Sequence, residues 1–96
     1  MLFRSPNAHV VGSRLTSVRF RAQTVEFDFS GVVIEDEGHP VVSSGSETFC
    51  YPEDGSRDAL CRLIGATVRR MRVSEANDAE LTLDDGSKLT LRPRRA

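Results

Sequence analysis

The chain has 96 residues, the size of one domain with a single modest core. Apolar residues make up 39% and charged residues 28%, a globular balance that excludes global disorder. The net charge of −1 excludes the strongly basic character that is typical of nucleic-acid-binding domains.

One passage of the sequence occurs twice. Residues 11–20 and 64–73 both begin with an apolar residue and a glycine, and both continue with apolar residues at the same three spacings. An arginine precedes the last apolar residue of each copy, and the likeness extends from 25–29 to 79–83. Such repetition predicts one supersecondary unit that is used twice.

The first unit, about residues 11–35, is predicted to be a three-stranded antiparallel meander. Two-residue turns at Ala22-Gln23 and Ser30-Gly31 keep every large apolar side chain of its strands on one face. The first of these turns places Phe20 opposite Val25.

The linking segment, residues 36–63, is predicted to hold two short extended pieces and one helix. The extended pieces are Val41-Val42 and residues 48–51, which flank a polar loop. Ser56 is the expected helix N-cap. Apolar residues at helical spacing then predict a helix over 57–64, with one stripe made of Ala59, Leu60, Leu63 and Ile64.

The second unit, about residues 64–92, repeats the meander with longer turns. Parity of the apolar residues requires odd loops, and the three-residue sequences at 75–77 and 84–86 supply them. Asn77 and Gly86 are expected in the left-handed conformation that closes such loops.

Both units share two further features. The first two apolar residues of each unit's opening strand, Leu15 and Val18 in the first, are three apart, which predicts either a bulge or the end of a turn near Gly12 and Gly65. On the opposite face, Arg19 lies across from Glu26 in the predicted pairing, and an equivalent pair follows in the second unit. One buried and one solvated face per meander are therefore expected.

The predicted fold class is α+β, within a single domain of residues 1–96. Two pseudo-symmetric three-stranded antiparallel meanders are joined by a segment with one short helix. The pattern leaves open whether the meanders form one curved sheet or a sandwich. The curved sheet or half-barrel is favoured, because the apolar helix stripe needs a surface to cover.

In its helix, hairpin and residues 81–91, the chain resembles a group of small bacterial single-domain proteins that have no assigned activity. The first half, residues 11–29, is similar to them as well. The resemblance implies no catalytic residue. Some small bacterial proteins of this general kind are antidotes that bind a partner toxin, an analogy of fold alone.

The sequence carries no recognisable catalytic or metal motif. Cys50 and Cys61 lack a C-x-x-C spacing, and Cys61 is expected to join the core beside the helix. The histidines are His9 and His39, and His39 with the acidic run 35–37 offers at most a loose oxygen-rich metal site. A solvated turn is the favoured interpretation, so no catalytic, cofactor-binding or metal residue is predicted.

Arginines form the most suggestive cluster. Arg14, Arg69, Arg70 and Arg92 are predicted to line a possible interaction face. Nucleic acid is a weak candidate for that face, because no tryptophan is present and the phenylalanines of the strands point inward in the predicted register.

The leading hypothesis is a non-enzymatic protein-interaction module without a cofactor, which binds an unknown protein partner by its polar sheet face or an exposed edge strand. An antidote-like role is one form of this hypothesis. The alternatives are a small-molecule or metal-dependent activity in a cleft between the repeats, and weak nucleic-acid binding. Homo-oligomers are compatible with open edge strands. No apolar run reaches the roughly 20 residues of a membrane span, and residues 1–7 lack a signal-peptide core, so a cytoplasmic protein is expected.

Overall fold

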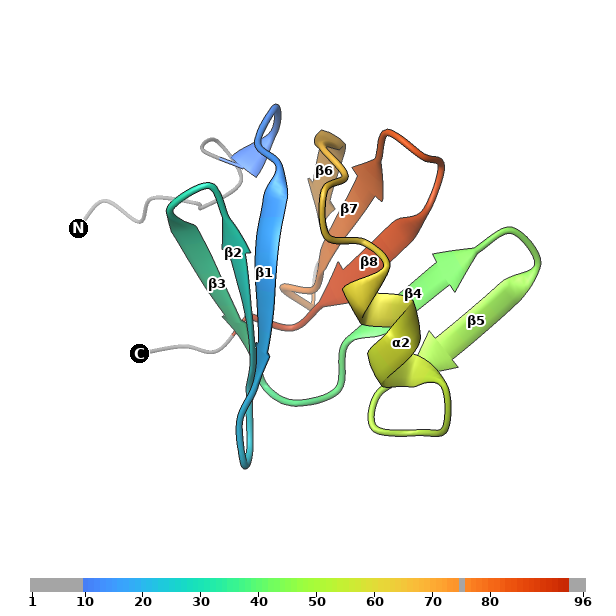
Figure 1. Ribbon diagram of the computed structural model, residues 1–96. Coiled ribbons are helices and arrows are strands. Elements are labelled where there is room, and N and C mark those ends of the chain that lie inside the picture. The colour runs from blue at the N-terminus through green and yellow to red at the C-terminus, as the bar shows by residue number, and fades with distance from the viewer. Residues whose placement is uncertain (1–9, 75, 94–96) are drawn as a thin grey trace.

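The computed structural model describes residues 10–74 and 76–93, which form two antiparallel sheets and one short helix (Figure 1). The first sheet has the strand order β1-β2-β3, and the second has the order β5-β4-β8-β7-β6. The predicted α+β class is confirmed. His9 and Glu75 lie outside the described residues.

The first sheet is the first unit of the repeat. Its strands are β1 (Leu15–Phe20), β2 (Val25–Phe29) and β3 (Val32–Asp36). Phe20 lies opposite Val25, and the last residue of β2 lies opposite the first of β3. Both predicted two-residue turns are therefore confirmed.

The second unit forms β6 (Val68–Val73), β7 (Ala79–Leu83) and β8 (Lys88–Leu91). Asn77 and Gly86 have φ angles of 68° and 92°, the left-handed conformation that three-residue hairpins need. The register shifts near the start of β6, and a matching shift occurs near the start of β1. The longer turns and the shared bulge are confirmed.

The linking segment extends the second sheet. It forms the hairpin of β4 (Val41–Ser44) and β5 (Glu47–Cys50), and β4 pairs with β8 through Val41 and Thr90. The two extended pieces expected from the sequence form this hairpin, whereas nothing in the sequence predicts that β4 pairs with β8. The second sheet thus has five strands where the repeat alone provides three.

The helix, α2 (Ser56–Cys61), is shorter than the predicted span of 57–64. Ser56 is not its N-cap: Gly55 takes that position with a φ of 83°, while the buried Ser56 hydroxyl donates a 2.6 Å hydrogen bond to the Glu53 carbonyl. A turn follows the helix, and it leaves Ile64 44% exposed. Ile64 is therefore not part of the buried stripe. Within the described residues, no helix is long and apolar enough to cross a membrane.

Both sheets and α2 contribute to one buried core. The two meanders keep separate sheets and face each other across it (Figure 1), so the single curved sheet favoured from the sequence is not what forms. The helix packs against β4, β5 and β1, at the side of this core. The largest fully buried side chains are Phe27, Phe29 and Leu15 from the first sheet, Leu60 from α2, and Leu81, Leu83, Leu89 and Leu91 from the second sheet.

The two units are joined by a short backbone ladder between residues 12–15 and 65–68, here called the first seam. The Gly12 N–H donates to the Val68 carbonyl at 2.7 Å, and the Gly65 N–H donates to the Leu15 carbonyl at 2.8 Å. These two bonds are each other's counterparts in the repeat. A second matched pair of bonds follows between the same segments at 2.9 Å each, so the first seam is symmetric.

The second seam is built around one buried carboxylate, that of Asp36 at the end of β3. It accepts hydrogen bonds from the backbone N–H groups of Gly38 at 2.7 Å, His39 at 2.8 Å and Arg92 at 2.6 Å. The Glu37 N–H also donates to the Arg92 carbonyl. The end of the first unit is thereby tied to the end of the second.

We expect Asp36→Ala to lower the free energy of unfolding by about 2–3 kcal/mol, because three part-buried N–H groups lose their acceptor. Asp28→Ala is the matched control, since the Asp28 carboxylate accepts one exposed N–H, that of Gly31. Urea unfolding followed by circular dichroism measures both. Equal losses in the two variants would contradict the role given to Asp36.

Candidate functional site

Three of the four predicted arginines lie beside the first seam. Arg14 forms an isolated bridge with Thr67 at the centre of that seam. Arg69 and Arg70 follow at the start of β6, where the register shifts. All three side chains are exposed, so the structure brings this part of the predicted interaction face together.

Arg92 lies elsewhere. Its partner is Asp78, whereas Arg70 lies opposite Thr82. Asp78 precedes Thr82 by four positions in the chain, which corresponds to about 13 Å of extended backbone. Arg92 therefore belongs to the opposite end of the second sheet.

The Arg92–Asp78 pair is well aligned but exposed. The Arg92 Nε donates to Asp78 Oδ1 at 2.9 Å. This hydrogen bond, followed by the charge of the same carboxylate, raises the pKa of Arg92 above its ordinary value. Solvent screens such a pair, so its main effect is to fix the direction of the guanidinium.

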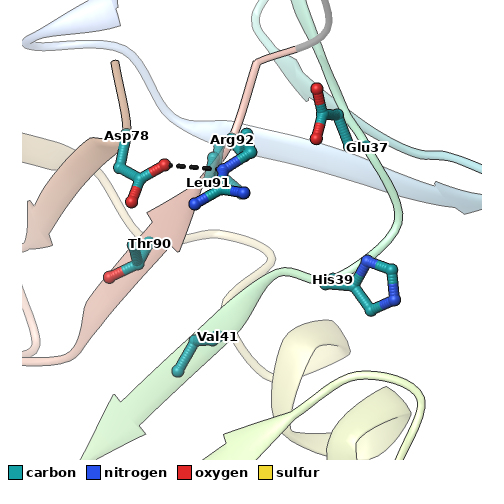
Figure 2. Close-up of a pocket in the computed structure, with 7 residues that line it drawn as sticks. All are labelled: Glu37, His39, Val41, Asp78, Thr90, Leu91 and Arg92. Carbon is teal, nitrogen blue, oxygen red and sulfur yellow. Dashed lines mark hydrogen bonds and ion pairs between the residues drawn. The ribbon is translucent and has the colours of Figure 1, made fainter. Parts of the chain in front are cut away.

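This pair borders a hollow of about 250 Å³. Figure 2 shows Asp78 and Arg92 on one side of it and Glu37 and His39 on the other. The hollow lies between the connection that follows the first unit and the strands of the second. Its lining residues are Glu37, His39, Val41, Asp78, Thr90, Leu91 and Arg92.

The acidic run before His39 does not converge on that histidine. Asp36 is buried and accepts backbone N–H groups, and Glu35 lies on β3 opposite Glu26. In the part of the chain that the structure describes, no group of three or more histidine, cysteine or acidic side chains could hold a metal ion.

Strand β6 is the last strand of the second sheet. Val68, its first residue, belongs to the first seam, and beyond it the outer side of β6 meets no other strand of the described residues. The Ser74 N–H donates to the Asp78 carbonyl at 2.9 Å, which marks a hydrogen-bonded pair of the antiparallel ladder. Such pairs alternate, so Met71 and Val73 direct their backbone groups away from β7. No other strand of residues 10–74 and 76–93 pairs with β6 on that side.

Residues 69–73 are here called the β6 edge. Arg69, Arg70 and Arg72 are exposed along it, and Val73 is 49% exposed. Among the described residues, the ion pair on this edge is that of Arg72 with Glu80, at 3.9 Å. The β6 edge therefore combines unused backbone groups with an excess of positive charge.

The equivalent strand of the first sheet, β1, is more covered. The Phe20 ring at its end stacks on Tyr51 with 5.2 Å between ring centroids, and the Arg57 guanidinium lies 5.3 Å from the Phe20 centroid. Both basic side chains near its end, Arg19 and Arg21, are paired with Glu26. The two halves of the repeat thus differ most at their outer edges.

We expect Cys61 to react with a thiol reagent faster than Cys50, because Cys61 is exposed whereas Cys50 is half-buried. The exposure also corrects the expectation that Cys61 joins the core: Ala59 and Leu60 are the buried residues beside it on α2. Absorbance of the released chromophore follows the two reactions. The Cys61→Ser variant should lose the fast phase, and a fast phase that persists would contradict this assignment.

No protein-family model, curated protein or solved structure matches this chain. Its function is therefore inferred from the placement of its own residues, above all those of the β6 edge and of the hollow.

Proposed function

We propose that this chain is a non-enzymatic protein-interaction module that binds an extended segment of a partner protein at the β6 edge. The observation that carries the proposal is that no strand of the described residues pairs with the outer side of residues 69–73. An added strand takes up main-chain hydrogen bonds there, and its alternate side chains provide specificity.

The choice among the four outer strands follows from length and cover. Strands β1 and β6 have six residues each, whereas β5 has four and β3 has five. The end of β1 carries the stacked Phe20 and Tyr51 rings. Beyond the first seam, this leaves residues 69–73 of β6 as the longest outer segment that no described strand or stacked ring covers.

A binding role is also supported by how the carboxylates of the hollow are used. Asp78 is bonded to Arg92, and the neighbouring Asp36 is occupied by three N–H groups. Acid–base catalysis by a carboxylate pair needs two carboxylates whose environments separate their pKa values. Asp36 and Asp78 are instead engaged in holding the backbone and the Arg92 side chain in place.

The proposal includes the cellular compartment in which the module acts. Cys50 and Cys61 are free thiols, which suits the reducing bacterial cytoplasm. An antidote that blocks a partner toxin is one form that a small cytoplasmic binding module takes. In that form the β6 edge would be the surface that engages the toxin.

A small carboxylate in the hollow is the second candidate. The Asp78 bond uses the Arg92 Nε, so the two terminal nitrogens of the guanidinium are not engaged in it (Figure 2). We expect succinate or glutamate to give saturation-transfer signals with the wild-type chain that Arg92→Ala abolishes. Signals of equal strength in the variant, or none in the wild type, would exclude this use of the hollow.

Val73→Pro tests the leading proposal. Proline removes the one N–H that points outward from the end of β6, and an outer strand accepts it without loss of the sheet. Val73→Thr is the matched control, since it keeps the N–H and the branched side chain. Circular dichroism checks that both variants are folded.

The measurement is affinity purification from the native host. We expect a protein that is recovered with the wild type and with Val73→Thr, and that is reduced at least roughly fivefold with Val73→Pro because main-chain bonding at the edge is lost. Equal recovery with Val73→Pro, or the absence of any specifically recovered protein, would overturn the proposal.

A further inference from the structure

We infer that the segment bound at the β6 edge is an acidic, extended stretch of another protein. The inference rests on the function proposed above and adds the chemistry of the partner. It follows from three observations: the difference between the two copies of the repeat, the charges along the edge, and the geometry of an added strand.

The two copies differ at the positions that would face a bound strand. Arg69 and Arg70 in the second copy correspond to Thr16 and Ser17 in the first. In the first copy the Thr16 hydroxyl donates to the carbonyl of Asp28 on the neighbouring strand. The guanidinium groups of the second copy are therefore a feature that the shared fold does not require.

The positive charge of the β6 edge is only slightly offset. Glu80 lies 3.9 Å from Arg72, whose side chain is 77% exposed. In the first sheet, by contrast, Glu26 is 19% exposed and pairs with two arginines, at 3.7 and 2.9 Å. Glu80 is the counterpart of Glu26 and pairs with one arginine, and within the described residues no ion pair joins Arg69 or Arg70, which an acidic partner could neutralise.

The geometry of strand pairing predicts the order of side chains in the partner segment. Arg70 and Arg72 lie opposite Thr82 and Glu80, on the solvated outer face of the sheet. Side chains directly across from them on an added strand would lie about 4.5–5.5 Å away between Cβ atoms. Carboxylates at alternate positions fit there, while apolar residues between them would contact Met71 and Val73.

A second copy of this chain fits the edge poorly. Two β6 strands paired antiparallel through Met71 would place Arg70 opposite Arg72 twice, and like charges directly opposite are destabilising. A nucleic acid fits less well than a peptide, because no aromatic side chain lies on the β6 edge for a base to stack on.

The experiment uses the full ¹⁵N-labelled chain and two synthetic peptides of roughly nine residues, the length of an ordinary strand. Glutamate alternates with valine or threonine in one peptide, and lysine replaces every glutamate in the other. We expect the acidic peptide to shift the amide signals of Met71 and Val73, and the lysine peptide to leave them unchanged.

Charge reversal supplies the matched variants. Arg70→Glu should weaken binding of the acidic peptide roughly tenfold, since an attractive cross-strand pair becomes a repulsive one. Arg62→Glu makes the same change of net charge at an exposed position after α2, and should leave affinity within about twofold. Equal binding of both peptides, or equal effects of both variants, would overturn the inference.

Two other outcomes would assign a different partner to the β6 edge. A dimer in sedimentation analysis that Val73→Pro dissociates would assign the edge to a second copy. A labelled single-stranded oligonucleotide that shifts the same amides would assign it to nucleic acid.

If neither peptide binds while a host protein is still lost with Val73→Pro, the acidic character fails and the edge-binding function stands. If the acidic peptide binds but the host protein is retained with Val73→Pro, the proposed function fails instead.

Discussion

The symmetric backbone ladder of the first seam is the constraint on which the rest of the structure depends. Its bonds join the starts of β1 and β6, and they hold the apolar faces of both meanders against one core. Just after the ladder, each of the two strands has its bulge. Beyond the bulges, no strand of the described residues pairs with the outer side of β1 or of β6. Asp36 completes the closure at the other end, where the sheets are joined through a side chain.

Much of the fold could be predicted because alternation within a strand is specified by burial. A shift of one position in the hairpin of Phe20 and Val25 would turn its apolar side chains to water, so the turn lengths followed from the pattern. The seams could not be predicted in this way. The first seam consists of backbone bonds between segments far apart in the chain, and such bonds leave no mark in side-chain type. The second seam depends on one carboxylate that accepts backbone N–H groups, one of them from the far end of the chain. Asp36 looked like one residue of a polar turn, and the attachment of β4 to β8 had no signal in the pattern.

The candidate site was predictable in part. The sequence indicated that Arg14, Arg69 and Arg70 belong to one region, and the register places them there, but it places Arg92 at the hollow. The pairing of Arg92 with Asp78 could have been predicted, because the register that aligns β7 with β8 also places Asp78 opposite Arg92. The sequence could not predict which backbone groups of β6 point outward, because this depends on which residue pairs of the ladder are hydrogen-bonded. The bond from the Ser74 N–H to the Asp78 carbonyl fixes that alternation.

The matched bonds of the first seam have a consequence for how such a chain can diverge. Each half gives the other the donors and acceptors that it receives, as two subunits do across a twofold axis. In a true homodimer, every substitution appears on both sides of the axis at once. Fusion into one polypeptide removes that restriction, so hydroxyl side chains at 16 and 17 can coexist with guanidinium groups at 69 and 70. The junction between the two halves thus stays symmetric, while the outer edges of β1 and β6 carry different side chains.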